Sequence, residues 1–248
     1  MNVAFVIPVY RHGSTLESVI TSLLPYSLPF IVVDDGNTAS DLEYINEVEK
    51  KYSDVHVVHL KKNCGKGKAM TQGVKKAFEL GFSHVFQIDA DGQHLASDCR
   101  AFIEAAEKNP ECLINGVPVY DESAPSLRKS AREFSNNWAR IVSWSSNIKD
   151  VLCGFRIYPV KPYIALLRRF AWINRRMGYD VDILVHLLWS KVHLVNLPVH
   201  VTYPADGISN FRMVRDNIGI SLTFTRLCIG MILRFPILLF RKITGTLP

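Results

Sequence analysis

Two aspartates one residue apart, Asp89 and Asp91, follow directly after the apolar run 84–88. A short apolar run that ends in turn residues is typical of a buried strand, so both carboxylates are expected at a strand end. They could bind one hard cation, Mg2+ or Mn2+, and the cation could bind the diphosphate of a nucleotide-activated substrate. Gln93 could add a neutral oxygen, whereas His94 fits a structural role better. Because Asp-X-Asp also occurs in ordinary solvated loops, this interpretation depends on the neighbouring clusters.

Two further polar clusters follow other apolar runs. Asp35 ends the run 30–33 and could accept hydrogen bonds from a base or a ribose, or could cap the next helix. The segment 63–69 places Gly65, Lys66 and Gly67 at the start of a helical pattern. Its spacing differs from Gly-X4-Gly-Lys-Ser/Thr, so it is not a P-loop. Glycines and lysines at a helix start nevertheless suit close approach of the backbone to a phosphate.

A last pair of carboxylates, Asp180 and Asp182, opens a helical pattern that begins after Gly178. Two positions two residues apart lie roughly 200° apart around a helix, so only one of them can face a ligand. The one that faces the metal could act as a general base and deprotonate an acceptor hydroxyl. The residue types leave open which of the two this is.

The order of apolar runs indicates how these clusters are positioned. Strand candidates alternate with amphipathic helices through the first half of the chain, at 3–9, 30–33, 55–60, 84–88 and 112–117. Such alternation predicts an α/β fold with a mainly parallel sheet covered by helices on both faces. Ligands bind beyond the carboxyl ends of the strands in such sheets, and all the early clusters lie there. In the second half we expect a helix at 126–148, a strand at 150–158, a helix at 179–189 and a strand at 192–201.

Composition limits the possible partners and compartment. With 248 residues and 48% hydrophobic content, the chain can bury a large core. A net charge of +6 favours an anionic partner. Much of the excess Lys and Arg lies near the apolar helices expected toward the C-terminus, which favours a membrane over nucleic acid as that partner. The five cysteines are scattered and form no Cys-X-X-Cys, which argues against a zinc site and fits a reducing compartment. The N-terminal run 3–7 is too short for a signal sequence, so we expect a cytoplasmic protein.

Taken in order, the motifs resemble a family 2 glycosyltransferase of the GT-A fold, the group that includes dolichyl- and polyprenyl-phosphate sugar transferases. The resemblance extends over residues 1 to about 215. It rests on the segments Ile7–Tyr10, Val32–Gly36, Asn63–Ala69, Asp89–His94, Asp150–Arg156 and Gly178–Asp182. Each motif alone is weak, but the ordered set is specific.

The resemblance implies a role for each matching position. The nucleoside would be held by Pro8, Tyr10 and Asp35, and the ribose-diphosphate would lie near Lys66 and Asp89. Asp91 would be the main metal ligand, with Gln93 and Asp89 assisting. The acceptor side would be lined by Gly154, Phe155 and Arg156, and Asp180 or Asp182 would be the base. In the segment 203–212, Ser209 and Arg212, together with Arg215, would close over the diphosphate.

This chain departs from related sequences at three points. It has Asn210 where they often have His, Asp182 where they often have Glu, and Arg11-His12 where they often have Asn-Glu. These departures concern the acceptor and the base more than the sugar-nucleotide chemistry.

The resemblance implies sugar transfer from a UDP- or GDP-sugar to a lipid-linked or glycan acceptor, by direct displacement with inversion. Two alternatives use a similar scaffold. A nucleotidyltransferase that makes a sugar nucleotide usually has a Gly-rich, basic loop after the first strand, and the segment 9–13 is a poor version of one. The second alternative is a non-catalytic module that binds lipid or protein. The presence of Asp35, Asp89, Asp91 and Asp180/Asp182 argues against it.

The C-terminal segment raises the question of membrane contact. Residues 222–240 are apolar and about long enough to span a bilayer, but Arg226, Arg234 and Pro236 interrupt them. We therefore expect a transferase domain at 1–215 and, at 216–248, amphipathic helices that lie in the interface. Arg226, Arg234, Arg241 and Lys242 would then face lipid phosphates. The protein would be peripheral on the inner face of the cytoplasmic membrane. The alternative is that these helices cover the sheet or mediate a dimer.

Overall fold

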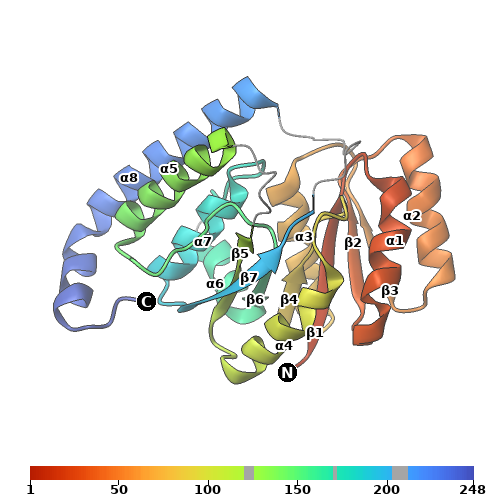
Figure 1. Ribbon diagram of the computed structural model, residues 1–248, viewed down its shortest axis with the longest axis horizontal. Helices are drawn as coiled ribbons and strands as arrows, with labels where there is room; N and C mark the ends of the chain where they lie inside the picture. Colours follow the sequence, from red (N-terminus) through yellow and green to blue (C-terminus); the bar gives the residue numbers. More distant parts are fainter. Residues whose placement is uncertain (120–125, 170–171, 203–211) are drawn as a thin grey trace.

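A mixed seven-stranded sheet forms the centre of the protein (Figure 1). The computed structural model describes residues 1–119, 126–169, 172–202 and 212–248, and every statement about the structure concerns these residues. In spatial order the strands are β3 (Val55–His59), β2 (Phe30–Asp34), β1 (Val3–Val9), β4 (His84–Gln87), β6 (Arg156–Pro159), β5 (Leu113–Val119) and β7 (Leu194–His200).

The sheet is mainly parallel, as the sequence predicts. The pairs β1–β2, β1–β4, β2–β3 and β5–β7 are parallel, whereas β6 runs antiparallel to both β4 and β5. The strand expected at 150–158 is wrong in its first half, because β6 begins only at Arg156. The Asp150 carboxylate accepts hydrogen bonds from the backbone N–H groups of Leu152 and Cys153, at 2.9 and 2.6 Å, which turns the chain instead.

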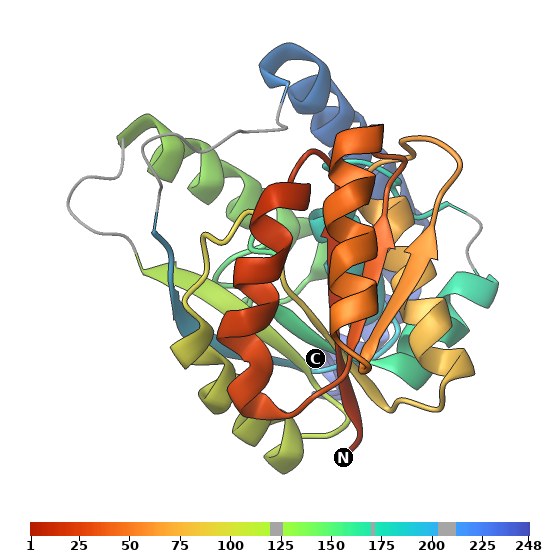
Figure 2. The ribbon, with the colours of Figure 1, turned by 90° about the vertical axis from the view of Figure 1, so that its right-hand side faces the viewer.

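Helices cover both faces of the sheet (Figure 2). One core lies between the sheet and α1, α2 and α4, and the other between the sheet and the remaining helices. The first group is α1 (Gly13–Leu23), α2 (Ala39–Lys51) and α4 (Cys99–Lys108). The second group is α3 (Lys66–Glu79), α5 (Ser126–Ser143), α6 (Val160–Arg169), α7 (Tyr179–Trp189) and α8 (Met213–Ile243). Two short 3-10 turns, η1 (Leu24–Tyr26) and η2 (Ala96–Asp98), complete the described elements.

Successive β1 residues divide between the two cores, as the period of a strand requires. Phe5 packs on the α1 side against Phe30 and Phe86, with ring centroids 5.4 Å apart in both pairs. Val6 points to the α3 side, where a Cβ on Gly73 would lie 2.4 Å from its Cγ1. Gly73 thus lets α3 pack close to the sheet, which brings the start of α3 to the carboxyl ends of β1 and β2.

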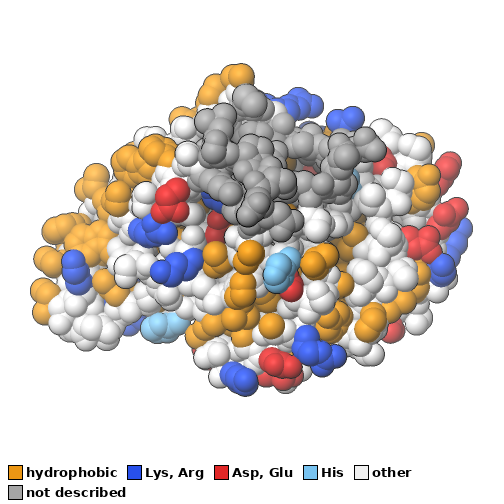
Figure 3. Space-filling view, in the orientation of Figure 1, with side chains coloured by type: hydrophobic (Ala, Val, Ile, Leu, Met, Phe, Trp, Pro, Cys, Tyr) orange, Lys and Arg blue, Asp and Glu red, His pale blue; other side chains and the backbone are white. Residues whose placement is uncertain are grey.

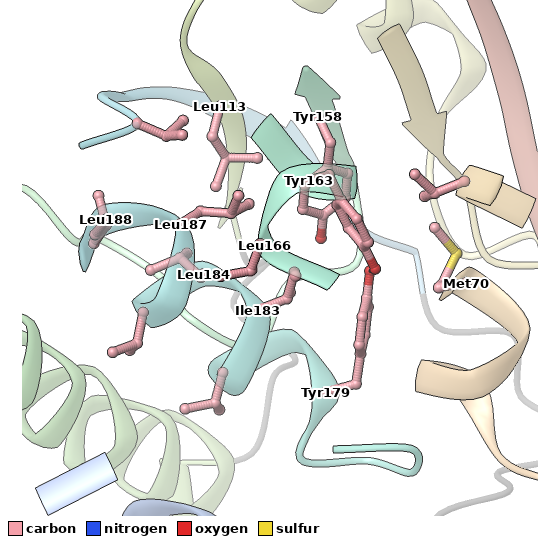
Figure 4. Packing of buried hydrophobic residues seen from close by; sticks show 14 of the residues in the cluster. Met70, Leu113, Tyr158, Tyr163, Leu166, Tyr179, Ile183, Leu184, Leu187 and Leu188 are labelled. Atoms are coloured by element: carbon pink, nitrogen blue, oxygen red, sulfur yellow. The ribbon is translucent and has the colours of Figure 1, made fainter. Parts of the chain in front are cut away.

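The start of α7 is held in place by buried tyrosines (Figure 4). The hydroxyl groups of Tyr163 on α6 and Tyr179 on α7 lie 2.8 Å apart, and both side chains are fully buried. Tyr158 of β6 packs edge-on against Tyr163, with centroids 5.6 Å apart. The hydrogen bond between the two hydroxyls fixes the first turn of α7, which carries Asp180 and Asp182.

The C-terminal segment forms one continuous helix, α8, where we expected more than one amphipathic helix. It continues through Pro236, which lies on its exposed side. Its inner side adds Phe224, Leu227 and Leu238 to the core that α5 and α7 share. By length and composition alone, Val214–Ile243 could cross a membrane, and 22% of its most apolar stretch is buried against the rest of the chain. The domain boundary at 215/216 stays a prediction.

Candidate active site

Three charged side chains from different elements meet at the carboxyl end of β4. The ammonium group of Lys66, at the start of α3, lies 2.9 Å from the Asp89 carboxylate and 3.3 Å from Asp180 Oδ2. Gln87, in β4, donates from Nε2 to Asp180 Oδ1 at 3.2 Å. Burial lowers the pKa of Lys66, but the negative charges of Asp180 and Asp89 outweigh it and hold that pKa well above its ordinary value. Lys66 is therefore a permanent cation between two carboxylates.

Gly154 permits this cluster to form. A Cβ at this position would lie 2.7 Å from both Asp89 Oδ2 and Lys66 Nζ, and 2.9 Å from Gln87 Nε2. No real Cβ tolerates such distances, so any larger residue would displace the ion pair. Of the three residues expected on the acceptor side, Gly154 borders the cluster.

The side chains of the other two residues expected on the acceptor side, Phe155 and Arg156, are buried and line no open surface. Phe155 packs edge-on against Phe102, with centroids 4.7 Å apart. Arg156 donates to Asn115 Oδ1 and to the backbone carbonyl oxygen of Asp180, both at 2.7 Å. The expectation for these two side chains is therefore corrected, because Arg156 lies in the central strand β6 and Phe155, just before it, packs into the core. Arg156 instead helps to position Asp180 by its hydrogen bond to the backbone carbonyl oxygen of that residue.

Asp91 lies beside the Lys66 cluster on a tight turn. Its Oδ1 accepts the backbone N–H of Gln93 at 3.1 Å, and Gly92 takes a φ of 70° between them. Burial and the nearby charge of Asp89 raise the pKa of Asp91, whereas Lys66 overcomes burial and lowers the pKa of Asp89. A cation beside Asp91 would relieve the repulsion between these two carboxylates.

The donor set fits Mg2+ or Mn2+. Two hard carboxylates lie side by side, and among the described residues no group of three or more His, Cys, Asp or Glu could hold a metal by itself. Mg2+ is commonly bound by one or two carboxylates, with substrate phosphates and water completing the shell. Asp91 and Asp89 would be the ligands, and the position of Gln93 at the end of the same turn is compatible with assistance.

His94 forms one wall of this region. Its ring lies 5.0 Å from that of Phe155, and its Nε2 lies 4.0 Å from the Cys153 Sγ. Burial lowers its pKa more than Asp89 and Asp91 raise it, so the imidazole stays neutral near pH 7. A neutral ring packed on an aromatic residue fits the structural role expected from the sequence.

Asp35 anchors the loop that leads into α3. Its buried carboxylate accepts hydrogen bonds from the backbone N–H groups of Cys64 and Gly65, at 2.7 and 2.8 Å, and from Asn63 Nδ2 at 3.1 Å. Gly65 has a φ of 96°, which favours glycine. Burial raises the pKa of Asp35 despite these bonds. The Asp35 carboxylate thus holds the loop 63–65, which leads into α3, at the carboxyl end of β2.

Pro8 and Tyr10, also expected at the nucleoside, lie half-buried at the end of β1. Their contact with a nucleoside stays a prediction, as does that of Asp35.

The segment 174–178 crosses the start of α3. The sequence alone did not predict this contact. The backbone N–H of Lys68 donates to the Arg175 carbonyl oxygen at 3.0 Å. Cβ atoms at Gly65 and Gly67 would lie 2.5 Å and 2.2 Å from the carbonyl oxygens of Arg175 and Asn174. Two arginines, Arg175 and Arg176, are thereby brought to the loop that Asp35 anchors. The two adjacent arginines shortly before Gly178 are the feature of the sequence that could have indicated a role for this segment in binding an anion.

The structure separates the two acidic residues of α7. Asp180 faces Lys66 at the carboxyl end of β4. Asp182 points the other way and is fully buried, where it accepts the Asn174 backbone N–H at 2.6 Å and pairs with Arg226 of α8. Its Oδ1 also lies 3.2 Å from His186 Nδ1. Burial acts to raise the pKa of Asp182, but His186 and Arg226 together hold it below its ordinary value. Of the two α7 carboxylates, Asp180 is therefore the one that lies at this edge.

The segment that would close over the diphosphate is only partly described. Arg212 immediately precedes α8, and its backbone N–H donates to Asp216 Oδ2 at 2.7 Å. Its side chain and that of Arg215 are exposed. Ser209 and Asn210 lie outside the described residues.

Comparison with known proteins identifies the family of this chain. The model of the family described as glycosyl transferase family 2 matches residues 4–167. Polyprenol monophosphomannose synthase from Mycolicibacterium smegmatis is 22% identical over 211 residues, which covers 82% of this chain and 78% of that protein. Undecaprenyl-phosphate mannosyltransferase from Micrococcus luteus is 24% identical over 205 residues, which covers 80% and 83%.

Among solved structures, glucosyl-3-phosphoglycerate synthase from Mycobacterium tuberculosis, in complex with Mn2+, UDP-glucose and phosphoglyceric acid, shares the fold. The TM-score is 0.64 at 16% identity, and the match covers 92% of this chain and 79% of that one.

Proposed function

The chain belongs to glycosyl transferase family 2, and we propose that this glycosyltransferase moves a sugar from a UDP- or GDP-sugar to a lipid-linked or glycan acceptor at the inner face of the cytoplasmic membrane. The observation that carries the proposal is the Lys66–Asp89–Asp180 cluster beside Asp91 at the carboxyl end of β4. A fixed cation, a pair of carboxylates that can bind a metal and a further carboxylate beside them are groups that can serve nucleotide-sugar transfer.

The geometry of the loop before α3 supports donor binding at this position. Asp35 holds the loop 63–65, and Arg175 and Arg176 lie across it, so positive charge surrounds the start of α3. This arrangement suits the diphosphate of the donor, with the nucleoside toward Pro8 and Tyr10. Arg212 would add a further cation from the start of α8.

Bond cleavage at the anomeric carbon leaves a nucleoside diphosphate with growing negative charge. Asp91 and Asp89 would hold Mg2+ or Mn2+, which would neutralise part of that charge. Lys66, fixed between Asp89 and Asp180, offers its ammonium group to the same region without reorganisation. Attack by the acceptor from the opposite side inverts the configuration at the anomeric carbon.

Asp180 has a different task for each class of acceptor. A hydroxyl acceptor must lose its proton, and the Asp180 carboxylate is the group at this edge that can take it. A phosphate acceptor is already an anion and needs no base, so Asp180 would then act only by orienting Lys66. The names of the two curated relatives, with polyprenol and undecaprenyl phosphate, support a lipid-phosphate acceptor. The exposed apolar side of α8 supports a membrane location.

The proposal is tested by incubating the purified protein with a panel of UDP- and GDP-sugars, Mn2+ or Mg2+, and undecaprenyl phosphate in detergent. We expect a glycolipid and free nucleoside diphosphate with one donor, and no product in EDTA. Asp91→Asn should abolish transfer, whereas Asp54→Asn, an exposed aspartate before β3, should retain it. In a parallel incubation with a sugar 1-phosphate and UTP or GTP, release of pyrophosphate would instead identify a nucleotidyltransferase. Absence of turnover with every donor and acceptor would contradict the proposal.

A further inference from the structure

The outer side of α8 is largely apolar. Most of its exposed apolar residues lie within about 100° of one another around a helix of 31 residues, about 45 Å long, so they form one stripe. They are Val214, Ile218, Leu222, Ile229, Ile232, Leu233, Phe240 and Ile243, and Phe235 and Ile237 flank the stripe on its two sides. Figure 3 shows hydrophobic side chains gathered over this end of the molecule. Phe134 and Ile141 of the neighbouring α5, 64% and 53% exposed, extend the surface sideways.

A small hollow with three arginines lies beside the C-terminal half of this stripe. It measures about 160 Å³ and is lined by Arg169 of α6, by Trp189 and Ser190 at the end of α7, and by Arg234, Ile237, Leu238 and Arg241 of α8. Asp216 is the only acidic residue in 213–248. Within the part of the chain that the structure describes, Arg169 and Arg241 take part in no ion pair. The hollow is therefore strongly cationic and has one apolar wall.

Packing holds two of the arginines in place. The Arg234 guanidinium lies 4.5 Å from the centre of the Trp189 ring and donates to the Gly230 carbonyl oxygen at 3.1 Å. A Cβ on Gly230 would lie 2.9 Å from that ring, so the glycine lets Trp189 pack against α8. Arg241 donates from Nη1 to the Trp189 carbonyl oxygen at 2.7 Å. Since a guanidinium carries five N–H donors, this bond orients Arg241 and leaves it able to bind an anion.

We propose that this hollow binds the phosphate of an anionic phospholipid headgroup while the apolar stripe of α8 lies among the acyl chains. A phosphate offers the acceptor geometry that guanidinium groups bind in pairs of hydrogen bonds. A phospholipid explains the apolar stripe beside the cationic hollow, which a free phosphate leaves unexplained. This inference deepens the membrane location within the proposed function, on which it rests, and is independent of the transfer reaction.

The contacts of the inner side of α8 imply that it lies in the plane of the membrane. Arg226 pairs with Asp182, Thr223 Oγ1 accepts a hydrogen bond from Asn174 at 2.7 Å, and Arg241 binds the end of α7. These contacts, which extend from residue 223 to residue 241, keep the helix on the domain. A helix held in this way presents one side to lipid and cannot cross the bilayer without breaking a buried ion pair.

The test is flotation of the full chain with vesicles of phosphatidylcholine alone or mixed with phosphatidylglycerol, without donor or acceptor. We expect binding to the mixed vesicles. The Arg169→Gln/Arg234→Gln variant should bind about 30-fold more weakly, since each basic group near an anionic surface contributes about fivefold. The matched control, Arg100→Gln/Lys108→Gln on the exposed side of α4, loses the same charge and should change binding less than about twofold.

A charge-conserving variant distinguishes specific hydrogen bonding to a lipid phosphate from general electrostatic attraction to an anionic membrane. Arg169→Lys/Arg234→Lys keeps the net charge and a cation over Trp189 but loses paired hydrogen bonds, so we expect binding to fall several-fold. Thermal unfolding of each variant checks its fold. Leu233→Ser/Phe240→Ser, at positions 75% and 67% exposed, should weaken binding to the same vesicles without altering stability.

Four results would overturn the proposal. The first is equal loss of binding in the Gln pair and in the α4 control. The second is unchanged binding of the Lys pair. The third is that inorganic phosphate protects the unaltered chain against heat unfolding and does not protect the Arg169→Gln/Arg234→Gln variant, while the unaltered chain binds no vesicles. The fourth is a stable dimer in analytical ultracentrifugation that the Leu233→Ser/Phe240→Ser variant dissolves while vesicle binding is absent. Each leaves the transferase assay in detergent unaffected, so this failure and that of the proposed function are distinguishable.

Discussion

Asp182 of α7 and Arg226 of α8 form an ion pair in which the carboxylate is completely buried, although the two residues are 44 positions apart in the chain. Two residues before Asp182, Asp180 contacts Lys66 at the carboxyl end of β4. The first turn of α7 therefore joins α8 to the charged cluster: one carboxylate faces the helix that we expect at the membrane, and the other faces the reacting groups.

This pair should stabilise the fold. Arg226→Ala leaves the Asp182 charge buried without its cation, so we expect the free energy of unfolding to fall by about 2–4 kcal/mol. The value is at the lower end for a buried pair because the Arg226 side chain is 36% exposed. Urea unfolding followed by circular dichroism measures it. Arg215→Ala, an exposed arginine of the same helix, is the control and should change stability by less than about 0.5 kcal/mol. Equal effects of the two substitutions would show that the ion pair contributes nothing.

Lys66 should be essential for transfer. Lys66→Gln removes the cation between Asp89 and Asp180, and we expect kcat/KM to fall by about 10²- to 10³-fold, as for other groups that stabilise charge at a leaving group. Steady-state kinetics with the identified donor measures the change. Lys68→Gln is the control, because this residue contacts the segment 174–178 through its backbone N–H. A similar loss for both lysines would indicate general weakening of phosphate binding instead.

Two glycines should respond in opposite ways to a methyl group. Gly154→Ala places a Cβ 2.7 Å from Lys66 Nζ and Asp89 Oδ2, so these side-chain ends must shift, and we expect transfer to fall by at least about 10-fold. Gly219→Ala, on α8, meets no atom within 4 Å. It should leave activity unchanged and raise stability by about 0.5–1 kcal/mol. Activity assays and thermal unfolding of both variants test the pair, and a fully active Gly154→Ala enzyme would refute the geometry of the cluster.

Stability should decrease as the pH falls below 7, partly because of His84. This side chain is 5% exposed, its Nε2 lies 2.8 Å from the Pro110 carbonyl oxygen, and burial lowers its pKa. The unfolded chain binds a proton near pH 6.5 while the folded chain resists it, so unfolding takes up protons in this range. The contribution of His84 is thus present above pH 6.5 and is lost as the pH falls toward its folded pKa.

The measurement is urea unfolding at pH 7.5, 6.5 and 5.5. His84→Gln should reduce the slope of stability against pH, because the glutamine does not titrate in this range. His193→Gln, at an exposed position, should leave the slope unchanged. An identical slope in the His84 variant and in the unaltered chain would exclude this histidine as a source.

The sequence by itself determined the parts of the protein that local patterns encode. Apolar runs of strand length alternate with amphipathic helices, so the mainly parallel sheet and its two helical layers could be predicted. Carboxyl ends of parallel strands share one edge, so the order of the motifs was enough to assign Asp35, Lys66, Asp89 and Asp91 to one region. The motifs around these residues were sufficient to indicate the family.

Only the tertiary structure decided which side chains face that edge. The choice between Asp180 and Asp182 depends on Arg226, which reaches Asp182 from a helix far along the chain. The position of Arg175 and Arg176 depends on how closely Gly65 and Gly67 allow another segment to approach. Local periodicity records which residues share a face, but the partner of each face is set by packing between distant elements. For that reason Arg226, expected to face lipid, points inward, while the hollow around Arg234 and Arg241 exists only because α6, α7 and α8 pack together.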